Sequence, residues 1–289
     1  MKDTRLPPAV RRTSRRYILE NSIARVCAAA LTAAAAHAAS FTWNNGAANS
    51  IWDTTSLNWS GVAWPLPGAD NDAIFDVTGA GAVTIDAGGV TANDILFSAA
   101  GYLIGGGTLT LNGAVNNITT SADATISAVI AGTNGLTKLG TGQLTLSGSV
   151  SNTFTGTTIV NNGTVVLGKT GGAFAINGDV QMGAGVAGNQ PNLRMAANEQ
   201  FGAGVVMTFV NPAGSYPRFD LQGTTQSLAG IVDATGAGVT QNEKLGGGGT
   251  AAAGTLTVNG AGTYSYNGYL RDQDNGGRPD LQPSASIVY

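Results

Sequence analysis

Three aspartates near the start of the chain could form a cation site. Asp70, Asp72 and Asp76 lie within seven residues of one another, and carboxylate oxygens are ligands that Ca²⁺ prefers. The segment lacks the central glycine and closing glutamate of the helical calcium loop, and the chain has no Gly-Gly-x-Gly-x-Asp repeat. The alternative is a turn whose Asp side chains accept hydrogen bonds from backbone amides. We favour the turn, and expect no metal or other cofactor.

A second acidic group lies near the end of the chain. Asp272, Asp274 and Asp280 follow closely on one another, together with Arg271 and Arg278. Two carboxylates are the minimum for glycoside hydrolysis, and β-coils do host polysaccharide-cleaving enzymes. These acids, however, stand in a Gly- and Pro-rich polar segment without aromatic residues that could form a substrate groove. We therefore expect no catalytic residues and no enzyme.

All four tryptophans lie in one segment, residues 39–80, at positions Trp43, Trp52, Trp59 and Trp64. Exposed Trp rings can stack on sugars, so the segment could be a carbohydrate platform for a surface glycan. The alternative is a cap that closes the end of a β-structure, because large aromatic side chains mostly bury area. We favour the cap.

Residues 1–38 have the features of a secretory signal peptide. The n-region is rich in positive charge, and an apolar run follows over Val26–Ala36. The run is too short to span a bilayer. Ala36-His37-Ala38 fits an Ala-x-Ala cleavage signal, so we expect cleavage between Ala38 and Ala39. Ser14-Arg15-Arg16-Tyr17-Ile18-Leu19 resembles a twin-arginine export motif, and a long basic n-region for general secretion is the alternative.

Cleavage there would change the chemistry available. Cys27 and His37 are the only Cys and His of the chain, and both precede Ala39. The mature chain then has no disulfide, thiolate nucleophile, Ser-His-Asp triad or His-ligated metal. Seven of the 14 Lys and Arg and two of the 17 Asp and Glu also precede Ala39, which leaves seven basic against fifteen acidic residues. This acidic balance excludes a basic surface for nucleic acid, and no mature stretch is apolar enough for a transmembrane helix.

The elements that would position these residues are short β-strands. Period-two alternation and β-branched residues predict strands at Gln143–Ser147, Thr157–Val160 and Thr164–Leu167, with Gly and Asn at the corners between them. Further strands are predicted over 82–85, 94–97, 101–104, 107–111, 124–126, 174–176, 180–182, 205–210, 218–221 and 226–232. Residues 107–113 are echoed at 142–148 and 254–260, which indicates a recurring rung. With 43 Gly in 289 residues and only 11% charged residues, the composition is typical of a β-solenoid.

One stretch of about 38 residues, 131–168, also has a family resemblance. Its Gly, Asn and Leu positions follow in order the pattern of the autotransporter-associated β-strand repeat, also called the passenger-associated transport repeat. The residues that match this pattern are Gly135, Lys138, Gly140, Gly142, Leu144, Leu146, Gly148, Asn152, Phe154, Gly156, Asn162, Gly163, Leu167 and Gly168. Ser149-Val150-Ser151 stands where the family has a shorter link. The resemblance implies an all-β fold, a right-handed parallel β-helix, in an exported bacterial protein.

We therefore expect a signal peptide over 1–38, a Trp-rich N-terminal cap over 39–80 and a β-helical passenger region over 81–289 that is truncated at its C-terminus. The truncation would leave an exposed last rung at Tyr289, and we expect self-association there.

The preferred function is a non-catalytic passenger scaffold that assists secretion or surface display and contacts the export machinery. Its location would be the cell surface, the outer membrane, the extracellular space or, for a truncated chain, the periplasm. A carbohydrate-binding or polysaccharide-cleaving β-helix and a fragment of a longer surface protein are the alternatives. Lys138, Arg194 and Arg218 are interpreted as solvated or hydrogen-bonding corners, not as catalytic groups.

Overall fold

The computed structural model describes residues 39–66, 71–210, 214–242, 252–271 and 285–288. These residues belong to one compact unit, His37–Tyr289. Apart from one 3₁₀ turn, η2 (Val77–Gly79), their regular structure is entirely β. The expected signal peptide, Asp70, and the acidic group at Asp272, Asp274 and Asp280 lie outside the described residues.

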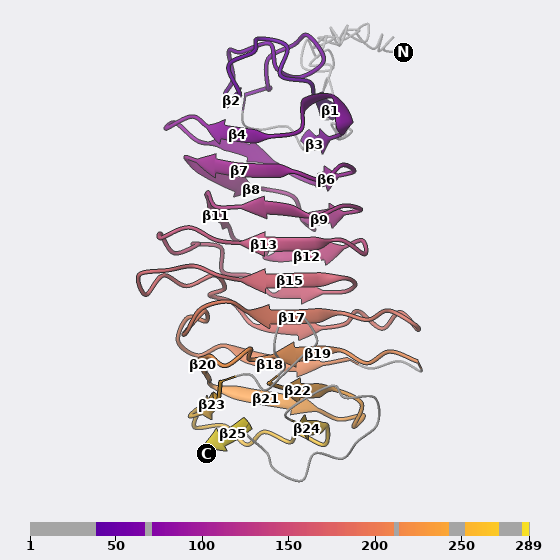
Figure 1. Cartoon of the computed structure of the whole chain (residues 1–289), viewed down its shortest axis with the longest axis vertical. Coiled ribbons are helices and arrows are strands. Elements are labelled where there is room, and N and C mark those ends of the chain that lie inside the picture. Colours follow the sequence, from indigo (N-terminus) through magenta and orange to yellow (C-terminus); the bar gives the residue numbers. More distant parts are fainter. Residues whose placement is uncertain (1–38, 67–70, 211–213, 243–251, 272–284, 289) are drawn as a thin grey trace, which may run out of the picture. The chain divides into compact units, whose positions relative to one another are not determined.

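Two long parallel sheets form two faces of the structure (Figure 1). The nine-stranded sheet has the order β1 (Ala39–Trp43), β3 (Asn71–Phe75), β6 (Ile95–Phe97), β9 (Asn117–Thr120), β12 (Leu136–Leu139), β14 (Thr158–Val160), β16 (Val180–Met182), β18 (Val206–Phe209) and β21 (Gly230–Asp233). The ten-stranded sheet has the order β2 (Ile51–Trp52), β4 (Ala82–Ile85), β7 (Tyr102–Gly106), β10 (Ala124–Ile126), β13 (Gln143–Leu146), β15 (Thr164–Leu167), β17 (Asn192–Met195), β19 (Arg218–Asp220), β22 (Val239–Gln241) and β24 (Tyr269–Arg271).

A third face consists of two separate three-stranded sheets. The first has β5 (Val90–Ala92), β8 (Thr108–Leu111) and β11 (Val129–Gly132), and the second has β20 (Thr225–Leu228), β23 (Gly254–Val258) and β25 (Ala285–Val288). Between these sheets, three turns of the chain continue the face without regular strands. The first of them lies on β11, because the amide of Thr153 donates to Ile130 O (2.8 Å) and that of Thr155 to Gly132 O (3.3 Å).

The chain passes through the three faces one after another, and each further turn of the coil adds one strand to each sheet. β6, β7 and β8 make one turn, and β9, β10 and β11 make the next, with each strand parallel to its neighbour. This arrangement is a parallel β-helix, so the predicted fold class is confirmed. The right-handed sense of the coil stays a prediction.

Side chains that point into the coil form apolar columns along it. Leu144 pairs in register with Val165, which pairs with Leu193, and all three are buried. On the same strands the alternate residues face outward, as in the burial pattern of β13, where Leu144 and Leu146 are buried and Gln143 and Thr145 are half-buried. Burial of apolar area at about 25 cal/mol per Å² stabilises a stack that contains no disulfide.

Most predicted strands are present, with corrections at two places. The predicted strand over 226–232 is two strands, β20 and β21, which lie on different faces because the chain turns a corner at Ala229. The predicted strand over 174–176 is wrong, since only an isolated bridge between Ile176 and Phe201 occurs there. The echoed sequence forms β8, β13 and β23, which belong to three different sheets. The echo therefore marks a buried strand and a corner, not a fixed position in a rung.

Glycines stand where the third face turns into the nine-stranded sheet. Gly135, Gly156 and Gly178 follow one another on successive turns. A Cβ at Gly156 would lie 2.2 Å from the backbone N of Gly135, and a Cβ at Gly178 would lie 2.3 Å from Gly156 O. Neighbouring turns approach so closely at this corner that any side chain would push them apart.

We predict that Gly156→Ala lowers the free energy of unfolding by about 2 kcal/mol or more, because its Cβ meets backbone of the adjacent turn. Gly168→Ala is the matched control in the same segment, since its nearest neighbour would be the Ala196 side chain at 3.3 Å. Its expected effect is below about 0.5 kcal/mol. Urea unfolding followed by far-UV circular dichroism measures both. Equal destabilisation by the two variants would contradict the steric account.

Candidate functional site

The segment with the repeat pattern occupies two stacked turns and pairs with itself. β12 lies beside β14, with Leu136 opposite Thr158, and β13 lies beside β15, with Leu146 opposite Leu167. The unit thus contains one complete turn and the two strands that stack on it.

The apolar and glycine positions of the pattern serve this stacking. Leu144, Leu146, Phe154 and Leu167 are buried. Besides Gly135 and Gly156, the glycines at which a Cβ would come within 2.8 Å of the backbone of another turn are Gly140, Gly142, Gly148 and Gly163. Gly168 is the exception, because its Cβ would come no closer than 3.9 Å to backbone and would meet only the Ala196 side chain at 3.3 Å. Asn162 caps its own corner, because its Oδ1 accepts from the amide of Gly163 (2.9 Å).

Lys138 is fully buried although it carries a charge. Its Nζ donates to Leu139 O (2.8 Å), Gly140 O (2.9 Å) and Asn162 O (3.1 Å). An ammonium has three N–H donors, so the carbonyls satisfy all of them. Burial lowers the pKa of Lys138 to about 8, and the Asp123 carboxylate opposes this shift. The side chain connects two turns at a corner, which confirms the hydrogen-bonding interpretation and rules out the solvated one.

Asn152 makes the equivalent connection on the third face. Its Oδ1 accepts from the amide of Ile130 on one neighbouring turn (2.9 Å), and its Nδ2 donates to Ala175 O on the other (2.9 Å). The side chain is buried, and both of its polar atoms have partners. In the segment of the wrongly predicted strand, 174–176, the carbonyl of Ala175 accepts from this side chain, and the amides of Ala175 and Ile176 both donate to Gln200 O.

Two glutamines continue this row of buried amides. Gln200 accepts from the amide of Lys169 through Oε1 (2.8 Å) and donates through Nε2 to Lys169 O (3.0 Å). The amide of Gln200 in turn donates to Gln226 Oε1 (2.9 Å), and Gln226 Nε2 donates to Ala197 O (2.8 Å). Neither glutamine was predicted from the sequence. Both glutamines have polar neighbours, Glu199 before Gln200 and Thr225 and Ser227 around Gln226, so no local pattern marks them as buried.

The four tryptophans form one buried cluster. Trp43, Trp52 and Trp59 expose 0% of their surface and Trp64 exposes 1%. The Trp59 and Trp64 ring centroids are 4.5 Å apart, and those of Trp52 and Trp59 are 5.0 Å apart. The Nε1 atom of Trp64 donates to Thr91 O (2.9 Å). A carbohydrate platform needs an exposed ring face, and these rings present none.

The described aspartates of the first acidic group bind backbone and side-chain donors of turns. Asp72 accepts from Asn93 Nδ2 (2.8 Å) and from the amide of Asp94 (3.2 Å), and Asp76 accepts from the amide of Thr78 (2.9 Å) at the start of η2. The turn interpretation thus holds for Asp76, whereas Asp72 lies on strand β3 and bonds to the adjacent turn. In the described ranges, no three His, Cys, Asp or Glu residues gather closely enough to hold a metal ion.

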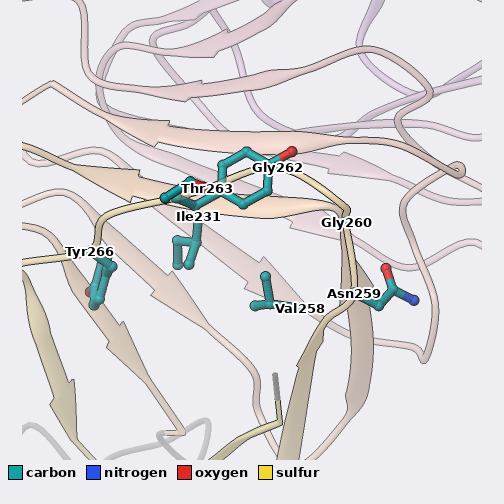
Figure 2. A pocket seen from close by; sticks show the side chains of 8 residues that line it. Ile231, Val258, Asn259, Gly260, Gly262, Thr263 and Tyr266 are labelled. Carbon is teal, nitrogen blue, oxygen red and sulfur yellow. The ribbon is translucent and has the colours of Figure 1, made fainter.

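A cavity of about 460 Å³ lies beside β21, the last strand of the nine-stranded sheet (Figure 2). The residues that line it are Ile231, Val258, Asn259, Gly260, Gly262, Thr263, Tyr264 and Tyr266. The Tyr266 hydroxyl lies 3.0 Å from both Gly238 O and Tyr269 O, and burial raises its pKa. Because these lining residues include no carboxylate, imidazole, thiol or amine, the cavity offers no acid–base pair.

No helix in the described parts of the chain has the length and apolar character needed to cross a membrane.

Comparisons with known proteins agree with the repeat pattern. Residues 136–167 match the family described as passenger-associated-transport-repeat. The chain is also 36% identical over 216 residues to the Adhesin BmaC autotransporter of Brucella suis biovar 1 (strain 1330), an alignment that covers 72% of this chain and 5% of that protein. The chain thus spans only a small part of this relative's length. No solved structure matches the chain.

We predict that Asn152→Leu lowers the free energy of unfolding by about 3 kcal/mol, because it leaves the amide of Ile130 and the carbonyl of Ala175 buried without partners. The exposed neighbour Thr153 supplies the control. Thr153→Ala should change stability by less than about 0.5 kcal/mol. Urea unfolding is again the measurement, and unchanged stability of Asn152→Leu would show that the amide does not connect the turns.

Lys138 makes stability depend on pH in the alkaline range. Below about pH 8 the amine is protonated in both the folded and the unfolded chain, so the cost of burying its charge is present in full. Between about 8 and the ordinary pKa of 10.5, the unfolded chain binds more protons at this group, and stability rises with pH.

We predict that wild type gains stability relative to Lys138→Met between pH 7 and pH 9.5, as measured by urea midpoints at the two pH values. The tyrosines and Lys169 are present in both proteins, so the difference isolates Lys138. Parallel pH profiles for the two proteins would contradict this prediction.

Proposed function

We propose that this chain, which contains a passenger-associated transport repeat at residues 136–167, is a non-catalytic β-helical passenger scaffold of an exported protein. The observation that supports this most strongly is the use of the repeat's polar residues. Asn152 bonds to backbone of both neighbouring turns, and Lys138 bonds to Asn162 O of the adjacent turn as well as to two carbonyls of its own corner. The repeat is therefore built to stack turns, and a scaffold is what such a unit provides.

The Trp cluster supports an N-terminal cap. β1 and β2 are the first strands of the two long sheets, and the rings of Trp43 and Trp52 lie within 5.1 Å of neighbouring Trp rings. A stack of rungs needs a closed end, because an open edge pairs with other chains. We propose that residues 39–80 serve this purpose, and that residues 81–289 are the passenger coil.

Two observations support the proposal that the chain is exported, namely the N-terminal segment and the similarity to the Brucella suis protein. Residues 1–38 have the basic, apolar and Ala-x-Ala parts of a signal peptide, and the similar protein is an autotransporter adhesin by name. We propose that the chain reaches the cell surface or the extracellular space through contact with the export machinery. The choice between general and twin-arginine secretion and the self-association of the chain stay predictions.

A polysaccharide-cleaving β-helix has less support. Cleavage by general acid–base chemistry needs two converging carboxylates. In the described part of the chain, Asp72 on β3 accepts hydrogen bonds from Asn93 and Asp94, and Asp76 accepts from the amide of Thr78.

The test is expression of the full chain in a diderm bacterium. We expect mass spectrometry to detect a processed protein that begins at Ala39. We also expect a protease added outside intact cells to digest this protein. We also expect Asn152→Leu to reduce its exported amount severalfold, while Thr153→Ala leaves it unchanged. Retention in the cytoplasm with residues 1–38 attached would overturn the export proposal. Release of reducing ends from polysaccharides by the purified chain would overturn the non-catalytic one.

A further inference from the structure

The positively charged residues of the described chain lie in two different environments. The mature part, from Ala39 onward, has seven Lys and Arg. Lys138 and Lys169 are buried, with their amines bonded to backbone carbonyls. In the ranges that the structure describes, the remaining cations are Arg194, Arg218 and Arg271, and all three lie on the ten-stranded sheet, on β17, β19 and β24.

The strand register places these arginines in two adjacent rows, on the face of the sheet opposite to the buried Leu193 and Phe219. One row contains Arg218, Val239 and Tyr269 on β19, β22 and β24. The other contains Arg194, Asp220, Gln241 and Arg271. Successive strands are about 4.8 Å apart, so Arg218 and Tyr269 are separated by roughly two such steps. Figure 1 shows β17, β19, β22 and β24 as neighbours in the last part of the stack.

A groove of about 340 Å³ lies on this face. The described residues that line it are Gln190, Tyr216, Arg218, Val239, Tyr269 and Arg271. Val239 is buried between Arg218 and Tyr269 in its row.

The wall of the groove comes from two corner segments that are bonded to each other. Gln190 Nε2 donates to Gly214 O (3.0 Å), and Ser215 Oγ donates to Asn189 O (2.6 Å). The groove is therefore built by hydrogen bonds between successive turns.

Tyrosine rings and guanidinium groups share this groove. Tyr216 is 53% exposed and Tyr269 is 60% exposed, which is unusual for large aromatic side chains. Arg271 donates from Nε to Gln241 Oε1 (3.1 Å), which holds its guanidinium over β22.

We propose that this groove binds an acidic saccharide, with Arg218 and Arg271 recognising its carboxylate or sulfate groups and Tyr216 and Tyr269 stacking on its rings. Guanidinium groups bind carboxylates and sulfates through paired, charge-assisted hydrogen bonds. Exposed tyrosine rings offer flat apolar faces beside these donors, which suit the C–H faces of a sugar. The mature chain is acidic overall, so it repels long polyanions such as nucleic acid outside this groove. The site goes beyond the proposed export role and does not depend on it.

Isothermal titration of the purified mature chain tests the proposal, with a heparin hexasaccharide and a hyaluronan hexasaccharide as acidic probes. Maltohexaose is the neutral control, and a Glu hexapeptide is the acidic control without sugar rings. We expect binding of at least one acidic saccharide and no binding of either control. Equal affinity for the Glu peptide would assign the groove to acidic peptides, and equal affinity for maltohexaose would exclude charge recognition. Either result overturns the proposal, as does no binding of both acidic saccharides.

Variants locate the site. We expect Arg218→Gln and Tyr216→Ala each to weaken saccharide binding by about tenfold. Arg194→Gln removes the same charge from the same face outside the groove, and it should change affinity by less than about twofold at physiological salt. Tyr216 lies in an exposed corner outside the strands, so Tyr216→Ala should fold. This variant therefore tests the groove even if Arg218→Gln does not fold. Equal losses in Arg194→Gln and Arg218→Gln, or no loss in Tyr216→Ala, would overturn the assignment.

Discussion

The close approach of successive turns is the constraint on which this structure depends. Parallel strands must lie about 4.8 Å apart to pair, and the corners between them must keep the same spacing. At the corner of Gly135, Gly156 and Gly178 this leaves no room for a Cβ, since one at Gly156 would meet backbone at 2.2 Å. The glycine content of the chain follows from this geometry, because each turn needs residues without side chains at its corners.

The same spacing decides how polar groups can enter the interior. A buried amide or amine costs free energy unless its hydrogen bonds are made, and the nearest partners in a stack are the backbone groups of adjacent turns. Asn152, Gln200 and Lys138 all use these partners. On the third face, between its two three-stranded sheets, side-chain amides add to the backbone hydrogen bonds that connect successive turns.

A stack held in this way leaves its outer face free to vary. Outward residues such as Arg218 and Tyr269 do not contribute to the apolar columns, so their types can change without disturbing the coil. Corner segments can lengthen as well, as between β16 and β17, because loops tolerate insertion where strands do not. Binding surfaces on such a scaffold therefore arise from rows of outward residues and from the loops beside them.

Local features of the sequence were sufficient to predict the strands of the repeat and its Gly and Asn corners, because alternation and corner chemistry act within a few residues. The β-helix itself was predicted from the family resemblance of residues 131–168. The face on which each strand lies was not predictable in this way, since nearly the same heptapeptide forms β8 and β23 on the third face and β13 in the ten-stranded sheet. The burial of Lys138, the amide row from Asn152 to Gln226 and the groove between Tyr216 and Tyr269 depend on residues about 20 to 55 positions apart. Those contacts exist only once the turns stack, because the register between turns is set by the packing of the whole coil and not by any one segment.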